Sequence, residues 1–262
     1  MFYIKIILNI IKTCNYWPRI LANRILTKFG LGFLAPRVEL IKLKNGMKFT
    51  MGPKRTIGGS DLFLISEIWK ENSYFIKTKA GFKIQKKDVV VDVGANRGYF
   101  TCFAAKAAIE GKVFAFEPAP DNFNILMANL KLNEITNVKA EDMAVSSSKG
   151  TRELYMIPGD EAANSLYSRS GIKVTVRAVD LPSYCKKRNI SKIDFLKIDC
   201  EGEEYEIFRS LPKYFWAMVR KVSMEFHIID GYDPSELVRT LVKQKFIILE
   251  FNNKYLKAEK PL

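Results

Sequence analysis

The residues with the clearest chemical signature form the run DVGANRG at 92–98, between an apolar stretch and a predicted helix. Glycine at such a junction lets the backbone turn tightly and approach a ligand closely. In open α/β sheets, ligands bind in the crevice at the carboxyl ends of the strands. The run therefore predicts a ligand-binding turn, whose binding residues are Asp92, Gly94, Ala95, Asn96 and Gly98.

A second acid, Glu117, ends the next apolar stretch and is followed by Pro118. An acid at the end of the second strand can accept hydrogen bonds from both ribose hydroxyls of a nucleoside. Asp142 ends or follows the third predicted strand and could bond an adenine amino group, with Met143 and Ala144 against the ring. Asp142 as a solvated loop acid is the other interpretation.

The type of turn distinguishes between cofactors. A dinucleotide site uses G-x-G-x-x-G, whereas this chain has D-x-G-x-x-x-G. Asp92 would repel a diphosphate but suits a cation, and S-adenosylmethionine carries a sulfonium and an α-amino group. We therefore predict S-adenosylmethionine as the cofactor, in preference to NAD. A tight turn that binds no ligand is the alternative, which the combination of Asp92 and Glu117 disfavours.

A further set of ionisable residues lies near the ends of two later strands. Alternate residues on a strand share a face, so members of each group can converge beside the cofactor. The predicted catalytic residues are Lys197, Asp199 and Glu201 on one strand and its loop, and Glu225 and His227 on the next.

A general base for an acceptor group would come from Asp199, Glu201 or His227. Each of these residues also has a structural interpretation. Lys197 and Asp199 could form an internal ion pair, and Glu201 could lie at the N-terminus of the following helix. His227 could be a core histidine whose hydrogen bonds are satisfied. Carboxylates of Asp199, Glu201 and Glu225 suit a divalent cation chemically, but their spacing does not demand one. No metal site is predicted.

Alternating strands and helices must position these residues. Strands are expected at 89–93, 113–117, 138–145, 193–199, 221–229 and 246–251, with helices at 99–110, from 120, at 203–210 and at 234–245. This alternation predicts a Rossmann-like α/β fold with a mostly parallel, seven-stranded, doubly wound sheet. Period-two patterns at 151–157 and 173–179 predict an inserted antiparallel hairpin.

The N-terminal part differs in pattern. Residues 1–38 show helical apolar spacing and a basic stripe, and their first acid is Glu39. This helix either packs on the core or, through residues 1–37, contacts an anionic membrane. Residues 38–52 alternate around Asn45-Gly46, which predicts a hairpin, and a helix that Ser60 or Asp61 could cap follows. We expect residues 1–80 to pack as an extension on a domain formed by residues 81–262.

The composition limits the classes of function and partner that the chain can have. The net charge of +14 favours polyanionic partners or is an ordinary basic surface. Four scattered cysteines and one histidine predict neither a zinc site nor a disulfide framework. No run of about 18 apolar residues occurs, and the first residues lack a signal-peptide pattern. A cytoplasmic protein is expected, with peripheral membrane contact as an alternative, and the sequence indicates no oligomeric state.

The sequence resembles the FkbM family of class I methyltransferases over roughly residues 38–252. The matching stretches, in the family's order, are SDLFLISEIW (60–69), VVVDVGANRGYFT (89–101), FAFEPAPDNF (114–123), AVSSSKG (144–150), VDL (179–181), FLKIDCEGEEYEIF (195–208) and VSMEFH (222–227). The most specific is the K-I-D-x-E-G-x-E run. Cys200 departs from the aliphatic residue usual there, and residues 1–37 lie outside the resemblance.

The resemblance implies methyl transfer to a hydroxyl of a sugar, a glycolipid or a related small metabolite. Two other classes of protein are alternatives. A nucleic-acid methyltransferase is disfavoured because the chain has no [DN]-P-P-[YFW] motif and no Pro-Cys nucleophile. A non-catalytic binding protein with the same fold remains an alternative, because fold does not fix function.

Overall fold

The computed structural model describes residues 2–36, 38–50, 59–71, 73–76, 81–156 and 171–261. Arg37, the predicted boundary at residue 80 and most of the polar stretch between the two strands of the predicted hairpin lie outside these ranges. The division into 1–80 and 81–262 therefore stays a prediction.

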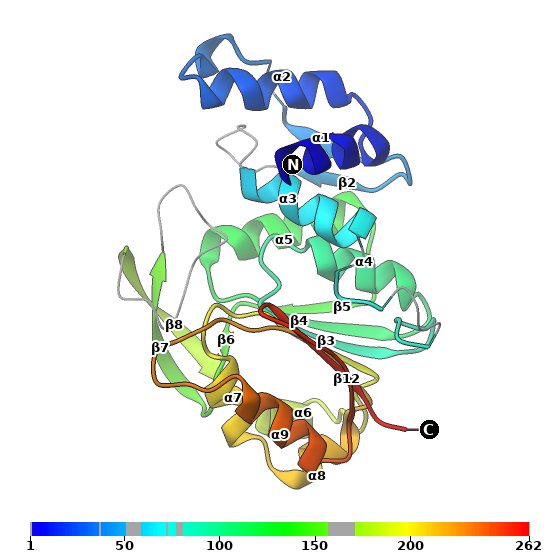
Figure 1. The fold of residues 1–262 in the computed structure, drawn as a ribbon, viewed down its shortest axis with the longest axis vertical. Coiled ribbons are helices and arrows are strands. Elements are labelled where there is room, and N and C mark those ends of the chain that lie inside the picture. Colours follow the sequence, from blue (N-terminus) through cyan, green and yellow to red (C-terminus); the bar gives the residue numbers. More distant parts are fainter. Residues whose placement is uncertain are drawn as a thin grey trace.

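A seven-stranded sheet forms the centre of the molecule, in the order β11-β12-β10-β9-β3-β4-β5 (Figure 1). The five strands from β10 to β5 are mutually parallel, whereas β12 runs antiparallel to both β10 and β11. The bounds are β3 Val89–Val93, β4 Lys112–Phe116, β5 Val138–Glu141, β9 Phe195–Ile198, β10 Lys221–Glu225, β11 Ile247–Phe251 and β12 Tyr255–Glu259.

The expected Rossmann-like, doubly wound sheet is confirmed, with one element that the sequence did not predict. This is β12, which inserts between β10 and β11. The third predicted strand is also shorter than expected, because the 138–145 segment breaks after Glu141 and its last two residues join another sheet.

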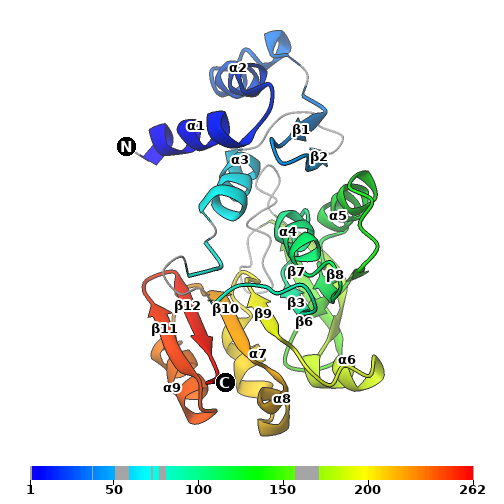
Figure 2. The same cartoon turned by 90° about the vertical axis from the view of Figure 1, so that its right-hand side faces the viewer.

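Two helical layers cover the sheet, one on each face (Figures 1 and 2). Strand β3 shows why both layers are needed: Val90 is buried in the core under one face, and Val91 and Val93 in the core under the other. One layer contains α4 Tyr99–Ala107 and α5 Pro120–Leu132, and the other contains α6 Leu181–Lys187, α7 Glu204–Ser210, α8 Lys213–Met218 and α9 Ser235–Lys243.

The expected hairpin between 151–157 and 173–179 is confirmed. It forms a separate three-stranded sheet of order β6-β8-β7, with β6 Ala144–Val145, β7 Gly150–Met156 and β8 Ile172–Val179. Strands β7 and β8 are antiparallel, and β6 pairs parallel to β8. Because β6 follows β5 directly, this sheet is attached to the edge of the main one.

The N-terminal elements stack on the α4–α5 layer (Figure 2). They are α1 Phe2–Thr13, α2 Trp17–Lys28, the 3-10 turn η1 Gly32–Leu34, the hairpin β1 Leu40–Lys42 and β2 Lys48–Thr50, α3 Gly59–Ser66 and the π-helical turn η2 Glu67–Glu71. The predicted Asn45-Gly46 hairpin is confirmed, and Gly46 has the positive φ that its turn requires.

Contacts from α5 hold this hairpin in place: the Asn129 and Asn133 amide oxygens accept from the backbone N–H groups of Thr50 and Lys48. Asp61 does not cap α3 as expected. It lies inside the helix, and its carboxylate accepts hydrogen bonds from the side chains of Arg97 and Tyr99, because their donors approach it from the α4 side. Among the residues described, no helix is both long and apolar enough to cross a bilayer.

Candidate functional site

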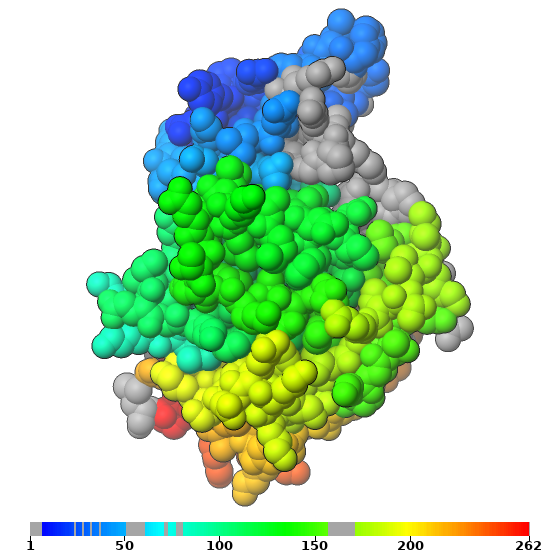
Figure 3. Space-filling view, turned by 180° about the vertical axis from the view of Figure 1, so that it is seen from behind, coloured from blue at the N-terminus to red at the C-terminus, as the bar shows by residue number. Residues whose placement is uncertain are grey.

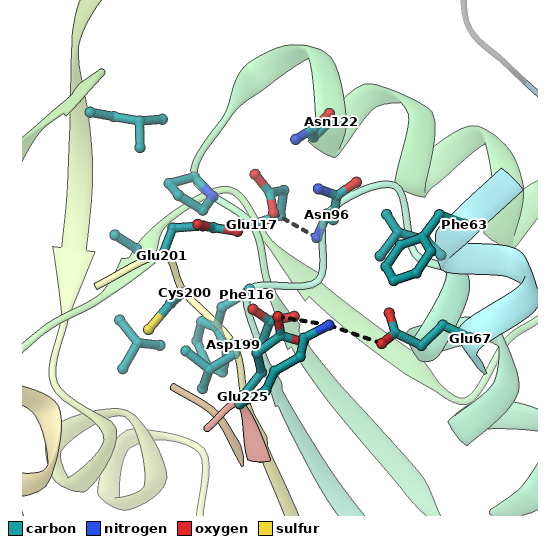
Figure 4. Close-up of a pocket in the computed structure, with 18 residues that line it drawn as sticks. Phe63, Glu67, Asn96, Phe116, Glu117, Asn122, Asp199, Cys200, Glu201 and Glu225 are labelled. Carbon is teal, nitrogen blue, oxygen red and sulfur yellow. Dashed lines mark hydrogen bonds and ion pairs between the residues drawn. The ribbon is translucent and has the colours of Figure 1, made fainter. Parts of the chain in front are cut away.

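A pocket opens at the carboxyl ends of β3, β4, β9 and β10, beneath α3 and η2 (Figure 4). This is the edge where parallel α/β sheets bind ligands. Its lining residues are Phe63, Leu64, Glu67, Val93, Gly94, Asn96, Phe116, Glu117, Pro118, Asn122, Ala144, Val145, Leu154, Asp199, Cys200, Glu201, Glu225 and Lys254.

The turn after β3 forms the floor of the pocket. Gly94 has a φ of +77°, and a Cβ built there would lie 1.7 Å from the backbone oxygen of Asp199. Gly98 has a φ of +84°, and a Cβ there would lie 2.4 Å from a Leu126 methyl group. Gly94 is therefore required by conformation and by space, and Gly98 by its conformation, as the sequence predicted for a tight turn.

Glu117 faces the pocket from the end of β4 (Figure 4). One carboxylate oxygen accepts from the Asn96 backbone N–H at 2.7 Å, and the other accepts from the Ala119 N–H at 2.9 Å. Burial raises the pKa of Glu117 to about 7, although the two backbone donors oppose that rise. The side chain is fixed by main-chain donors and keeps further lone pairs for a ligand.

Asp92 lies below this floor and does not line the pocket. It is fully buried, accepts a hydrogen bond from Thr101 at 2.6 Å, and has an oxygen 3.2 Å from Nζ of Lys197. We expected Asp92 to meet the cationic ligand directly. The structure instead gives it internal partners, the Thr101 hydroxyl at one oxygen and the Lys197 ammonium beside the other, because the side chain of a residue inside β3 points into a helix layer.

Lys197 links its own strand, β9, to the end of the neighbouring strand, β3. Its ammonium donates to the backbone oxygen of Gly94 at 2.6 Å and lies 3.6 Å from a carboxylate oxygen of Asp199. Burial alone would lower the pKa of Lys197, but the Asp92 and Asp199 carboxylates outweigh it and hold the pKa above its usual value. Lys197 is therefore a buried cation that braces the floor, as the internal ion-pair interpretation expected.

Asp199 lines the pocket at the end of β9. One of its oxygens accepts a 2.8 Å hydrogen bond from the Tyr74 hydroxyl, which is fully buried beneath it. Burial, followed by the negative charge of Asp199, raises the pKa of Tyr74 well above its usual value. Tyr74 is therefore a fixed donor that orients the carboxylate.

His227 does not face the pocket as a free base. Its Nε2 lies 3.2 Å from Glu201, and its Nδ1 lies 3.0 Å from the fully buried Glu204. Burial would lower the pKa of His227, but the hydrogen bond to Glu204 and the charges of Glu204 and Glu201 raise it to about 9. A protonated ring has no lone pair to take a proton, so this geometry favours the satisfied-histidine interpretation.

Glu201 lines the pocket but precedes α7 by three residues and adopts a φ of +55°. Its carboxylate meets His227. Glu201 was the residue predicted to lie at the N-terminus of this helix. There, however, the Glu204 carboxylate accepts the hydrogen bond from the Cys200 backbone N–H. Among the described residues, Asp199, Glu201 and His227 form a cluster. Each contributes one oxygen or nitrogen atom, and these three atoms lie within 4.8 Å of one another.

A second charged group closes the pocket on the α3 side. Nζ of Lys254 lies 3.0 Å from Glu67 and 3.2 Å from Glu225, linking η2 to the end of β10 (Figure 4). Burial and the nearby Asp199 carboxylate raise the pKa of Glu225, and Lys254 opposes them. Glu225 thus joins the pocket lining as expected, held by a lysine that the sequence did not indicate.

The predicted adenine contacts divide into two groups. Ala144 and Pro118 line the pocket. Asp142 and Met143 are not among the lining residues, and the exposed Asp142 carboxylate pairs with Arg177 on β8. The solvated-acid interpretation of Asp142 matches this position better than the adenine contact does.

Several lining residues were missed from the sequence. Phe63, Leu64 and Glu67 come from α3 and η2, and Lys254 from the loop before β12. The resemblance stretch at 60–69 was the available signal for the first three. Nothing predicted Lys254, because β12 itself was not expected.

Comparison with known proteins agrees with this geometry. The model of the methyltransferase FkbM domain matches residues 92–248. The methyltransferase sdnD of Sordaria araneosa is 28% identical over 66% of this chain and 75% of its own. The 31-O-demethyl-FK506 methyltransferase FkbM of Streptomyces tacrolimicus is 28% identical over 74% and 84%.

The hexuronic acid methyltransferase AglP of Haloferax volcanii is 29% identical over 62% of this chain and 64% of its own. The family model spans more than half of the chain and includes the turn after β3, Glu117, Asp199 and His227. The chain belongs to the FkbM methyltransferase family and is an S-adenosylmethionine-dependent methyltransferase.

Proposed function

We propose that this methyltransferase transfers its methyl group to a hydroxyl oxygen of a sugar, a glycolipid or a related small metabolite. The observation that carries the proposal is the placement of Asp199 and Glu225, from neighbouring parallel strands, on one wall of the pocket that Gly94 and Glu117 floor. This arrangement supports the proposal because it offers proton acceptors beside the position that we assign to the cofactor.

The donor side of the pocket fits S-adenosylmethionine. Gly94 lets the turn after β3 pass against the Asp199 backbone, where a Cβ would lie 1.7 Å from the oxygen, and the Glu117 carboxylate is presented by two backbone donors. We assign Glu117 to the ribose hydroxyls, with Asn96, Pro118 and Ala144 around the nucleoside. The surplus of carboxylates suits a cationic cofactor. Asp92 acts indirectly, by holding Lys197.

On the acceptor side, Asp199 is our proposed general base. Tyr74 fixes one carboxylate oxygen, so the other can accept the proton of an acceptor hydroxyl. Glu225 lies beside it as the second candidate. When bound, S-adenosylmethionine supplies an activated methyl carbon with a good leaving group. Positioning and exclusion of water by the pocket walls, including Phe63, then contribute much of the rate.

The names of two relatives support the acceptor class, since one acts on an O-demethyl form of FK506 and the other on a hexuronic acid. The transfer is balanced: the hydroxyl oxygen bonds to the methyl carbon, the carbon–sulfur bond breaks, and the proton moves to the Asp199 carboxylate. The products are a methyl ether and S-adenosylhomocysteine.

Mass spectrometry of glycans and lipids from wild-type and deletion cells tests this proposal. We expect one methyl group to be lost from a hydroxyl of one glycan or lipid species. Expression of the wild-type chain should restore that group, and expression of Asp199→Asn should not. Loss of a methyl group only from the nucleic-acid fraction would support the nucleic-acid alternative. A purified, folded protein that binds no S-adenosylmethionine in calorimetry would support the non-catalytic one.

A further inference from the structure

The N-terminal helices carry an unusual concentration of exposed apolar side chains. Nine of the seventeen large apolar residues exposed in the described structure lie between positions 7 and 34. Phe33 is 82% exposed, and Tyr16 and Phe29 are each 73% exposed. We call these nine residues the N-terminal apolar surface: Ile7, Leu8, Tyr16, Trp17, Ile25, Phe29, Leu31, Phe33 and Leu34.

This exposure does not arise from poorly anchored helices. On their inner side Ile10, Cys14 and Ile20 are buried in the core shared with α4. The Asn9 amide donates to the Ser66 hydroxyl at 2.9 Å, which ties α1 to α3. The Asn23 amide donates to a backbone oxygen at 2.8 Å. The segment therefore carries apolar side chains on two sides. The inner side packs on the core, and the outer side is exposed.

The same segment is strongly basic. Residues 1–38 contain six lysines and arginines and no aspartate or glutamate. Lys12 and Arg19 are exposed, and so is Lys44, whose backbone N–H bonds Thr13 at the end of α1. Cations around exposed aromatic and aliphatic side chains are the pattern of a segment that lies in the interface of an anionic bilayer.

We propose that the N-terminal apolar surface docks this enzyme on an anionic lipid bilayer. Phe29, Leu31, Phe33 and Leu34 enter the boundary between headgroups and acyl chains, while Arg19 and its neighbours meet lipid phosphates. Charge excludes a second copy as the better partner, since two acid-free basic surfaces would repel each other. Nucleic acid would match the charge but leave the aliphatic side chains uncovered.

The N-terminal part of the chain also contributes to the pocket. Helix α3 lies between α1 and the sheet, and it supplies Phe63 and Leu64 to the pocket wall (Figures 1 and 2). Figure 3 shows the same N-terminal segment at one end of the molecule from behind. Docking there would favour an acceptor that carries a lipid chain. This last step rests on the proposed function, whereas docking itself does not.

Vesicle flotation tests the docking. The full chain is mixed with vesicles of phosphatidylcholine alone or of phosphatidylcholine with phosphatidylglycerol, at low and at physiological salt. We expect binding to the anionic vesicles only, weaker at higher salt. Phe29→Ser combined with Phe33→Ser should reduce binding at least about tenfold, because the bilayer would lose two aromatic side chains that it buries in the bound state. Arg19→Gln should reduce it about fivefold.

Tyr214→Ser is the matched control, because Tyr214 is 63% exposed on α8, in the layer across the sheet from α1. It should bind vesicles as the wild type does. Circular dichroism and S-adenosylmethionine calorimetry should show that every variant is folded and retains the cofactor site. Equal vesicle binding by the double variant, or none by the wild type, would overturn the proposal, as would light scattering showing that the surface joins two copies.

The two proposals can fail separately. A wild-type chain that binds S-adenosylmethionine but no anionic vesicle contradicts docking alone. A chain that floats with anionic vesicles but binds no S-adenosylmethionine contradicts the proposed function and leaves docking supported.

Discussion

The two halves of the pocket are held in different ways. On the side that we assign to the donor, backbone N–H groups fix Glu117, and glycines at 94 and 98 let the turn pass close to Asp199 and Leu126. On the acceptor side, side chains hold one another: Tyr74 orients Asp199, and Lys254 bridges Glu67 and Glu225. Main-chain donors cannot titrate, whereas carboxylates and lysines can. The donor half should therefore depend on strict geometry and on the charge of Glu117 alone, and the acceptor half on the charges of several side chains.

The largest effect is expected at the contact between the halves, from Gly94→Ala. The new Cβ would lie 1.7 Å from the Asp199 backbone oxygen and would also require a positive φ. We expect a loss of more than about 3 kcal/mol in the free energy of unfolding. Gly231→Ala is the control, because Gly231 has a φ of +85° with no atom within 4 Å. It should cost about 1–2 kcal/mol; equal losses in denaturant titrations would remove the steric argument.

Asp199→Asn probes the acceptor half. It keeps an oxygen for the Tyr74 hydroxyl but removes the proton acceptor, so kcat should fall about 10²- to 10⁴-fold. The affinity for S-adenosylmethionine should change little, which calorimetry on the same sample measures. Glu225→Gln serves as the comparison and should lower kcat less. A larger effect of Glu225→Gln would transfer the role of base to Glu225.

Glu117→Ala probes the donor half. Loss of two charge-assisted hydrogen bonds to the ribose should weaken S-adenosylmethionine binding about 30- to 100-fold, measured by calorimetry. Glu110→Ala is the control, since Glu110 is solvent-exposed at the far end of α4. If Glu117→Ala binds the cofactor as tightly as the wild type does, the ribose assignment is wrong.

The pH dependence of cofactor binding gives a smaller effect. Burial raises the pKa of Glu117 to about 7, so its carboxylate takes up a proton as the pH falls through 7 and becomes a poorer acceptor. S-adenosylmethionine binding should weaken below pH 7, by at most about tenfold per pH unit because one proton is involved. Glu117→Gln should flatten the profile, and an unchanged slope in that variant would assign the proton elsewhere.

A chelator should have almost no effect. Asp199, Glu201 and His227 come together, but the carboxylates of Glu204 and Glu201 raise the pKa of His227 to about 9, so its proton already supplies a positive charge at neutral pH. A divalent cation would have to displace that proton. We expect turnover in EDTA to match the control within about twofold. Activity that is lost in EDTA and restored by Mg²⁺ or Mn²⁺ would contradict a metal-free site.

The donor half was largely predictable because its parts are close in sequence. Gly94, Gly98 and Glu117 lie on two consecutive strand–helix units, so strand pattern and residue type were enough. Asp92 shows the limit, since its type suggested a ligand contact and only its packing revealed Thr101 and Lys197 as partners.

The acceptor half depends on contacts between distant segments. Tyr74 reaches Asp199 over 125 positions, and Lys254 reaches Glu67 over 187. Neither pair has a local pattern, and strand β12, which follows Lys254, was not expected. The sheet was predictable from alternation, but the antiparallel insertion of β12 is a choice of topology that a strand pattern does not encode.

The π-helical turn at Glu67–Glu71 has a consequence for how the pocket could be altered. A π-turn contains one residue more than the α-helical turn it replaces, and this turn lies between the pocket-lining residues Phe63 and Leu64 before it and Tyr74 after it. Deleting a single residue from this turn would restore a regular helix, and the remaining side chains would keep their chemical types. The length of this turn, as much as its chemistry, therefore sets the position of Tyr74 beneath Asp199, so a change in length here would displace that carboxylate rather than exchange the side chains of the wall.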